Sequence, residues 1–188
     1  MTNRVLPSPE LQTFFISRET SNCPLTSEII KLGQNLNHIG LTDKETGIVS
    51  LKYGKRLLIN AKNIDVKTMK QHDVVEIVDY DAVKNILMVI GTKDPCAEAP
   101  VHWIIQKARH DINALLQINS STVFEKLQGT LPSTEKEPSR VMLDQAKELL
   151  TMLQTGKTIL IKNTGVVFIG RNMKEIQDAL QKYLGGQE

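Results

Sequence analysis

The sequence is poor in the residues and patterns that several classes of protein require. Its two cysteines, Cys23 and Cys96, lie in no CxxC motif or Cys/His cluster, which excludes a zinc finger and a disulfide framework. The longest uninterrupted apolar run, Ile86–Ile90, is far shorter than the roughly 20 residues of a membrane span. No apolar stretch follows a basic start, so we expect no signal peptide. These absences favour a cytoplasmic protein with no membrane partner.

Charge of one sign and aromatic side chains are equally limited. The 23 basic and 21 acidic residues leave a formal net charge of +2, and aromatic residues make up 4% of the chain. The basic residues are spread evenly and no aromatic platform for bases lies among them, so we expect no nucleic-acid partner. The glycines form neither GxGxxG nor GxxxxGK followed by Ser or Thr, the loops that hold the phosphates of nucleotides.

The composition divides the chain into an N-terminal extension, residues 1–24, and a single domain, residues 25–188. Pro7 and Pro9 interrupt the extension, and Ser, Thr and Asn dominate its second half, so we assign it no regular structure. Its apolar side chains can dock on the domain or on a neighbouring subunit; they are Leu11, Phe14 and Phe15.

Hydrophobic periodicity predicts helices and strands that alternate through the domain. Apolar residues three and four apart predict helices, and alternation or short apolar runs predict strands. The predicted helices span residues 24–39, 67–71, 99–109, 122–127, 141–154 and 172–183. The predicted strands span residues 48–53, 56–59, 74–80, 86–90, 112–118, 158–161 and 166–169. Paired strands among covering helices predict a layered α/β domain with substantial antiparallel pairing.

Local signals predict how several of these elements begin and end. Gly54-Lys55 is the turn of a hairpin, Asp65 caps the short helix, and Asn172 caps the last helix. Thr122-x-x-Glu125 predicts a capping box, and Leu143 is expected on the inward side of its helix. Residues 128–140 are polar and contain two prolines, which predicts a long loop with a mobile, site-covering role.

The histidines do not form a metal-binding pair on a helix or a strand; they are His38, His72, His102 and His110. Glu98 and His102 are four residues apart at the start of a predicted helix, where one face can let them share a proton or a ligand. The alternative is that Glu98 only interacts with the first helical turn and that His102 is a half-buried polar residue. Spacing alone leaves both interpretations open.

The order of several motifs resembles one family over about residues 27–184. The motifs are Gly47-Ile48-Val49-Ser50-Leu51-Lys52, Glu98-Ala99-Pro100-Val101-His102, Arg109-His110-Asp111 and Leu160-Ile161-Lys162-Asn163-Thr164-Gly165 with Gly170. They are similar to the Gly-Asn-Ile-Ser-Val-Arg strand, the Glu-x-x-x-His helix, the Arg-x-Asp turn and the Leu-x-Asn-His-Gly hairpin of the class II aldolase/adducin family. Zinc-dependent members of that family cleave sugar phosphates such as fuculose 1-phosphate. The resemblance implies a layered αβα domain with a central, largely antiparallel sheet covered by helices.

The resemblance also implies where metal ligands would lie. The family holds zinc with three histidines, and their positions fall on Gln117, Asn119 and Thr164 of this sequence. Amide and hydroxyl oxygens are poor ligands for a cation that prefers nitrogen and sulfur. We therefore expect no zinc and no other cofactor.

The phosphate-binding region is altered in the same comparison. It falls on Gly47, Lys62 and Cys96, with Ile48 in place of an asparagine and Cys96-Ala97 in place of two serines. Lys62 can still attract an anion. Glu98 is retained and corresponds to the acid/base residue of the family.

Two functions follow from these residues. The first is a non-catalytic small-molecule-binding or assembly module that has lost the zinc and phosphate ligands. Its cleft would bind a carbohydrate-like ligand between Glu98, His102, Gln117, Asn119 and Thr164. The alternative is a diverged sugar-phosphate aldolase or isomerase with Glu98 as acid/base. The resemblance further implies a homo-oligomer, with the fourfold tetramer as the family precedent.

Overall fold

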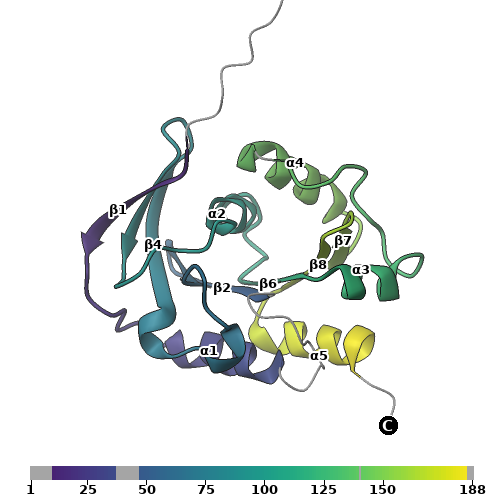
Figure 1. The fold of residues 1–188 in the computed structure, drawn as a ribbon, viewed down its shortest axis with the longest axis horizontal. Coiled ribbons are helices and arrows are strands. Elements are labelled where there is room, and N and C mark those ends of the chain that lie inside the picture. The colour runs from purple at the N-terminus through teal and green to yellow at the C-terminus, as the bar shows by residue number, and fades with distance from the viewer. Residues whose placement is uncertain (1–9, 37–46, 140, 186–188) are drawn as a thin grey trace, which may run out of the picture.

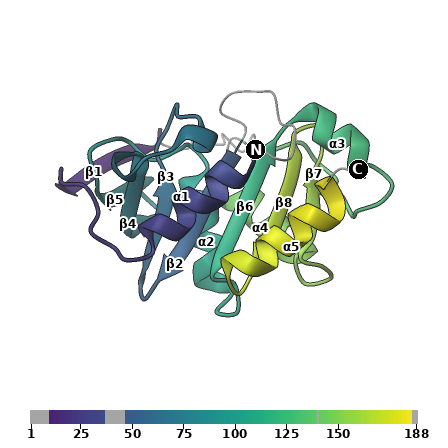
Figure 2. The same ribbon diagram turned by 90° about the horizontal axis from the view of Figure 1, so that it is seen from below.

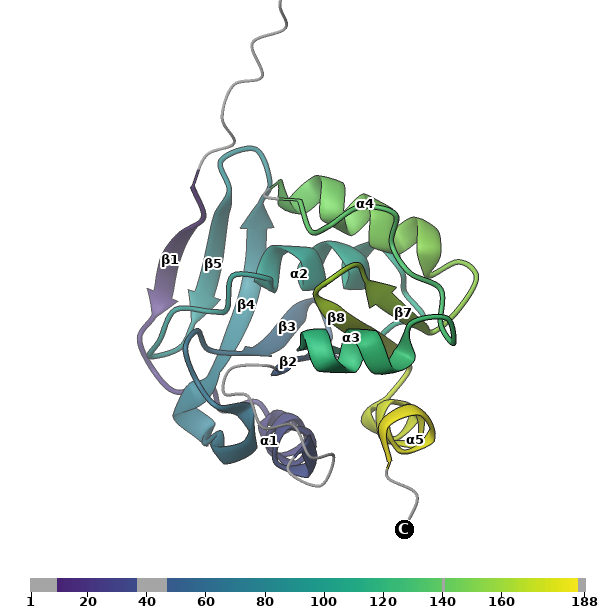
Figure 3. The ribbon, with the colours of Figure 1, turned by 45° about the vertical axis from the view of Figure 1, so that its right-hand side comes forward.

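The computed structural model describes residues 10–36, 47–139 and 141–185. These residues form one sheet of eight strands in the order β1-β5-β4-β3-β2-β6-β8-β7, which Figure 3 shows from β1 to β7. β1 pairs with β5 in parallel, and all other neighbours pair antiparallel. The strands are β1 (Gln12–Ser17), β2 (Gly47–Tyr53), β3 (Arg56–Asn60), β4 (Val74–Asp81), β5 (Ile86–Ile90), β6 (Ala114–Asn119), β7 (Thr158–Ile161) and β8 (Gly165–Gly170).

Helices cover both faces of this sheet, which confirms the layered αβα architecture (Figures 1 and 2). One face carries α1 (Thr26–Asn35), α3 (Ser121–Leu127) and α5 (Met173–Leu184), whose apolar side chains share one core cluster. The other face carries α2 (Ala99–Ala108) and α4 (Met142–Met152). Two short 3₁₀ turns, Val66–Thr68 and Gln71–Asp73, precede β4. Within the described ranges, no helix is long and apolar enough to cross a membrane.

The central strands are buried on both faces, which explains their nearly continuous apolar sequences. In β2, Val49 and Leu51 point into the cluster under α1 and α5, whereas Ile48 joins the cluster under α2. Ser50 shares the α2 face because side chains two apart lie on the same side of a strand. This alternation brings a polar side chain to the inner surface of α2.

The expectation that the extension has no regular structure is wrong for Gln12–Ser17, which is the edge strand β1. Leu11 and Phe15 pack against the cluster under α2, so these two side chains of the extension dock on the domain. Local pattern did not indicate this strand, because β5, with which it pairs in parallel, lies about 70 residues further along the chain.

Several predicted ends and faces need correction. The cap of α3 is Ser120, whose Oγ accepts from the Val123 amide at 3.3 Å, so the capping box at Thr122 is wrong. In α4, Leu143 is 43% exposed, and Leu149 lies inside instead. Asn172 and the Gly54-Lys55 turn are as predicted: Asn172 accepts from the Glu175 N–H, and Tyr53 pairs with Arg56. Asp65 accepts from the Lys67 N–H, but it caps the 3₁₀ turn Val66–Thr68, and the helix predicted over residues 67–71 is wrong. His38 and the last residues of the helix predicted over 24–39, residues 37–39, lie outside the described residues.

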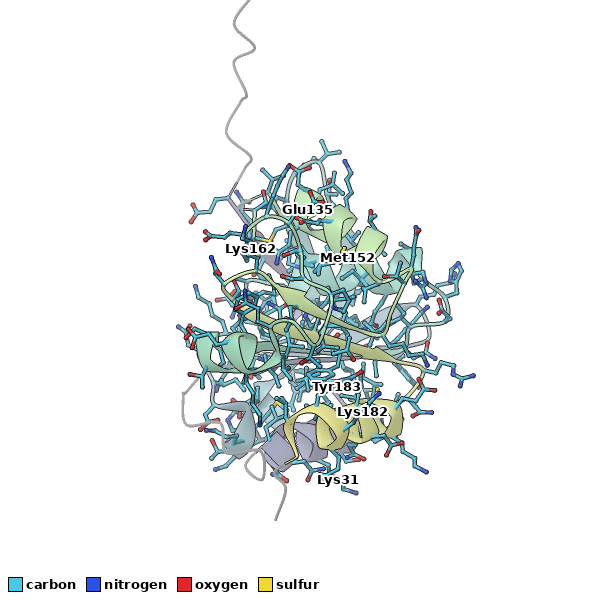
Figure 4. The ribbon with its side chains drawn as sticks, turned by 90° about the vertical axis from the view of Figure 1, so that its right-hand side faces the viewer. Lys31, Glu135, Met152, Lys162, Lys182 and Tyr183 are labelled. Carbon is cyan, nitrogen blue, oxygen red and sulfur yellow. The ribbon has the colours of Figure 1, made fainter. Side chains whose placement is uncertain are left out.

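Residues 131–134 of the polar loop run along β7. The Thr134 amide donates to Leu160 O at 2.9 Å, and the Leu160 amide donates to Pro132 O at 2.8 Å. Figure 4 looks at this side of the molecule and labels Lys162, whose Nζ donates to Glu135 O at 3.0 Å. The loop therefore covers one edge of the sheet.

Candidate functional site

The residue before α2 and the end of β6 place three polar side chains in hydrogen-bond contact. The Gln117 Nε2 donates to Asn119 Oδ1 at 2.8 Å, and the Asn119 Nδ2 donates to Glu98 Oε1 at 3.1 Å. Gln117 and Asn119 lie on one face of β6, as their spacing predicts. Gln117 is buried, whereas Asn119 and Glu98 are half-buried. The amide groups thus connect the carboxylate of Glu98 to the interior.

A second group of polar contacts lies deeper under α2. His102 is fully buried, and its Nδ1 lies 2.8 Å from Ser50 Oγ. The same Oγ accepts from Gln106 Nε2 at 2.9 Å. Since the serine oxygen already accepts from an amide, its own proton is free to go to Nδ1. This arrangement favours the neutral tautomer that carries its proton on Nε2.

Burial keeps His102 neutral. It lowers the pKa of the imidazole to about 3, and the Gln117 side chain partly opposes this shift. His102 Nε2 and Gln117 Oε1 are both buried, and neither forms a hydrogen bond of ordinary geometry. The Gln117 side chain lies close enough to raise the pKa of His102, and a ring N–H and an amide oxygen are complementary, so the two groups of contacts meet at this point. We call the joined set the α2–β6 network; it consists of Gln106, Ser50, His102, Gln117, Asn119 and Glu98.

The network fits neither interpretation of the Glu98/His102 spacing in full, neither a directly shared proton or ligand nor a half-buried histidine. Glu98 and His102 share no side-chain hydrogen bond: Glu98 bonds to Asn119 and Asn119 to Gln117, and the Gln117 side chain lies beside His102. The backbone N–H of His102 donates to Glu98 O at 3.1 Å, as in any helical turn. The expectation of a half-buried histidine is wrong, because no part of the side chain is exposed.

The backbone brings Thr164 close to the end of β6. Asn119 pairs with Gly165, and a Cβ on Gly165 would lie 1.8 Å from Ile118 O, so only glycine fits this approach. The hydroxyl of Thr164, however, donates to Lys162 O at 3.2 Å within its own turn. Four of the five predicted cleft residues therefore lie together between β6 and α2, and Thr164 lies next to Gly165, the first residue of β8.

These donors do not fit a zinc ion. Within the described ranges, no group of three or more His, Cys, Asp or Glu side chains is placed to hold a metal. Gln117 and Asn119 offer neutral amides that already bond to each other and to Glu98. Zinc sites in proteins are built from thiolate, imidazole and carboxylate ligands.

The expected phosphate region is packed with apolar groups. Residues 60–62 lie beside residues 94–96, joined by hydrogen bonds from Lys62 N to Asp94 O (2.9 Å) and from Cys96 N to Asn60 O (3.3 Å). Ile48 and Cys96 are buried in one hydrophobic cluster, and burial raises the pKa of the Cys96 thiol well above its usual value. Lys62 is exposed. Gly47 packs tightly, since a Cβ there would lie 2.5 Å from Val66 Cγ2.

Sequence reasoning missed Ser50 and Gln106, which complete the network. A detectable signal existed: Ser50 is the polar residue at an inward position of an otherwise apolar strand, and Gln106 follows His102 by four residues. A buried hydroxyl requires a partner, and the helical neighbours of His102 supply it.

Comparisons with known proteins agree with the fold. Residues 27–120, half of the chain, match the class II aldolase and adducin N-terminal domain. The L-fuculose phosphate aldolase of Methanocaldococcus jannaschii is 26% identical over 141 residues, covering 68% of this chain and 74% of the relative. A solved L-fuculose 1-phosphate aldolase superimposes with a TM-score of 0.67 at 19% identity, covering 87% of this chain and 86% of its own.

A sugar-phosphate aldolase from Thermotoga maritima superimposes almost as well. Its TM-score is 0.66 at 15% identity, and the alignment covers 84% of this chain and 89% of that one. Identities this low carry the fold alone, but the match to the family extends over half of the sequence. The chain therefore belongs to the class II aldolase and adducin N-terminal domain family.

Proposed function

We propose that this chain is a non-catalytic member of the family, one that has lost the zinc and phosphate ligands and binds a small neutral polar molecule. One observation carries the proposal: Gln117 and Asn119, at two of the implied metal positions, hydrogen-bond to each other and to Glu98. Both amides are engaged in these hydrogen bonds, and neither supplies the imidazole or thiolate ligand that zinc prefers. By the same resemblance we propose that the chain forms a homo-oligomer.

Energetic reasoning supports the loss of aldol cleavage. A metal that polarises a carbonyl contributes several kcal/mol to stabilising the developing negative charge, and each 1.36 kcal/mol is tenfold in rate. A single carboxylate such as Glu98 supplies only about 10²–10⁴-fold as an acid or base. No cation within the network replaces the missing charge stabilisation.

The packing of the phosphate region supports a neutral ligand. Ile48 and Cys96 occupy positions where the resemblance implies an amide and a hydroxyl, and both are buried in an apolar cluster. An anion placed there would lose its hydration without gaining donors. The half-buried Asn119 and Glu98 offer amide and carboxylate groups that suit hydroxyl groups of a carbohydrate-like molecule.

A second function rests on Glu98 itself. Its carboxylate remains half-buried and is oriented by Asn119 at the start of α2, an arrangement that an acid/base residue also requires. The curated and solved relatives named above are aldolases. The alternative is thus a diverged lyase or isomerase with Glu98 as acid/base.

Metal analysis combined with a retro-aldol screen separates these functions. The protein is dialysed with equimolar zinc, its metal content is measured, and cleavage of sugar phosphates is followed beside the Glu98→Gln variant. We expect substoichiometric zinc and equal background rates in both proteins. Stoichiometric zinc, or cleavage that disappears in Glu98→Gln, would contradict the proposal. Thermal-shift screening of sugars with and without a phosphate then tests the preference for a neutral ligand.

A further inference from the structure

The two edge strands of the sheet differ in whether another segment of the chain covers them. Residues 131–134 cover β7 through backbone hydrogen bonds. In the part of the chain that the structure describes, β1 has β5 as its only neighbouring strand, and it forms the outer rim in Figures 1 and 3. Natural edge strands are usually protected by charges, prolines or a covering segment. Gln12–Ser17 contains no charged residue and no proline.

The outer side of β1 presents both apolar side chains and backbone groups. Phe14 is 60% exposed and Ile16 is 50% exposed, although both are large hydrophobic residues. The Gln12 amide donates to Asn85 O on the side of β5. Because backbone groups alternate along a strand, the N–H and C=O of Thr13 and Phe15 point to the open side. The register shift between Phe15 and Ser17 limits this open stretch to its first residues.

The geometry points to a second copy of this chain as the occupant of the β1 edge, added antiparallel about a twofold axis at Phe14. In that register Thr13 exchanges backbone hydrogen bonds with Phe15 of the second copy, and the axis repeats the exchange. The two Phe14 side chains then meet in a non-hydrogen-bonded pair, the closer of the two pair types. Gln12 lies opposite Ile16 of the second copy.

Charge complementarity favours this register. Glu10 precedes the strand and Arg18 follows it, both exposed, so antiparallel pairing sets the negative end of each copy against the positive end of the other. Parallel pairing in register would set Glu10 against Glu10. The Arg18 guanidinium lies 3.9 Å over the ring of Phe15, next to the open backbone groups. This inference does not depend on the proposed function.

Sedimentation velocity over a wide concentration range tests the inference. A short edge buries less surface than a standard interface, so we expect the chain, alone or within the homo-oligomer proposed above, to associate further in pairs as the concentration rises. Phe14→Lys places two ammonium groups opposite each other and should weaken the association at least about tenfold. Ile16→Lys should also weaken it. The matched control is Val83→Lys, which replaces an apolar residue that is 87% exposed outside the strand and should change nothing.

Cysteine cross-linking tests the register itself. In a Cys23→Ser background, which leaves only the buried Cys96, Phe14→Cys should oxidise to a disulfide-linked dimer, because facing Cα atoms lie about 4.5 Å apart. Gln12→Cys should not, because its two copies lie about 13 Å apart in this register. A mass that stays constant with concentration, a mass unchanged by Phe14→Lys, or equal cross-linking at both positions would overturn the inference.

Discussion

The triple variant Gln117→His, Asn119→His and Thr164→His tests the placement of the implied metal positions. Gln117 and Asn119 already touch at 2.8 Å, and Asn119 pairs with Gly165, the neighbour of Thr164. Three imidazoles at these positions give the donor number of a catalytic zinc site with an open fourth position. We therefore expect the variant, but not the wild-type protein, to bind one zinc ion per chain.

The expected stability change has two parts. Without metal, the variant loses the hydrogen bonds Gln117–Asn119 and Asn119–Glu98, which at about 1 kcal/mol each lowers the free energy of unfolding by about 2 kcal/mol. Zinc at a hundredfold excess over its Kd raises the free energy of unfolding of the variant by about 2.7 kcal/mol. For a chain of this length the gain on zinc addition corresponds to about 5–10 °C in Tm.

Differential scanning calorimetry with and without zinc, followed by a chelator, measures both parts. The matched control keeps Thr164 and places the third histidine at the neighbouring position: Gln117→His, Asn119→His and Asn163→His. The Asn163 side chain donates to Glu137 Oε1 at 2.9 Å, so it is committed to a different surface. A folded triple variant that binds no zinc, or a control that binds it equally well, would refute the placement of Thr164 beside β6.

Three further predictions concern the network. Ser50→Ala leaves His102 Nδ1 and a Gln106 amide proton buried without a partner, so urea unfolding should show a loss of about 2–4 kcal/mol; a loss below about 1 kcal/mol would contradict the assigned contacts. Because the folded-state pKa of His102 is lowered to about 3, the unfolded chain takes up a proton first as the pH falls from 6.5, and stability should decrease toward pH 4.5 with a slope of at most about 1.4 kcal/mol per pH unit. Between pH 6.5 and about 5 the slope should vanish in His102→Asn; below about pH 5 the unfolded chain also protonates Asp111 and Glu175, whose folded-state pKa values are lowered to about 2, so a slope from these carboxyl groups remains in the variant. Glu98→Gln keeps an oxygen that accepts from Asn119, so its unfolding free energy should stay within about 0.5 kcal/mol of wild type, whereas a loss of several kcal/mol would assign the carboxylate a structural role.

Much of the fold could be predicted because most elements have a periodic pattern of their own. The hairpin at Gly54-Lys55, the central strands and the helix capped by Asn172 all follow from residues within a few positions of each other. β1 could not be predicted in this way. β1 is held by pairing with β5 and by the packing of Leu11 and Phe15 against the cluster under α2. Neither β5 nor the residues of that cluster lie near β1 in the sequence.

The candidate site was only partly predictable for a similar reason. Spacing predicts that Gln117 and Asn119 share a face, and the helix start places Glu98 near it. Helical spacing does not reveal that His102 points to Ser50 on β2, because that contact depends on how α2 lies across the sheet. The distinction between a half-buried and a fully buried histidine depends on the same packing.

The network also explains why amide side chains suit the positions of β6 that face α2. A strand buried under α2 leaves no water to satisfy a polar side chain, and an unpaired buried donor or acceptor costs about 1–3 kcal/mol. An apolar residue at position 117 would leave the Nε2 of His102 facing a group that cannot accept its proton. Glutamine donates to Asn119 and has an oxygen that is complementary to the ring N–H of His102, so it suits the polar groups on both sides. Under the proposed function, the amide at position 117 and its neighbour at position 119 thus hold Glu98 at the surface and His102 in the interior without any charge between them.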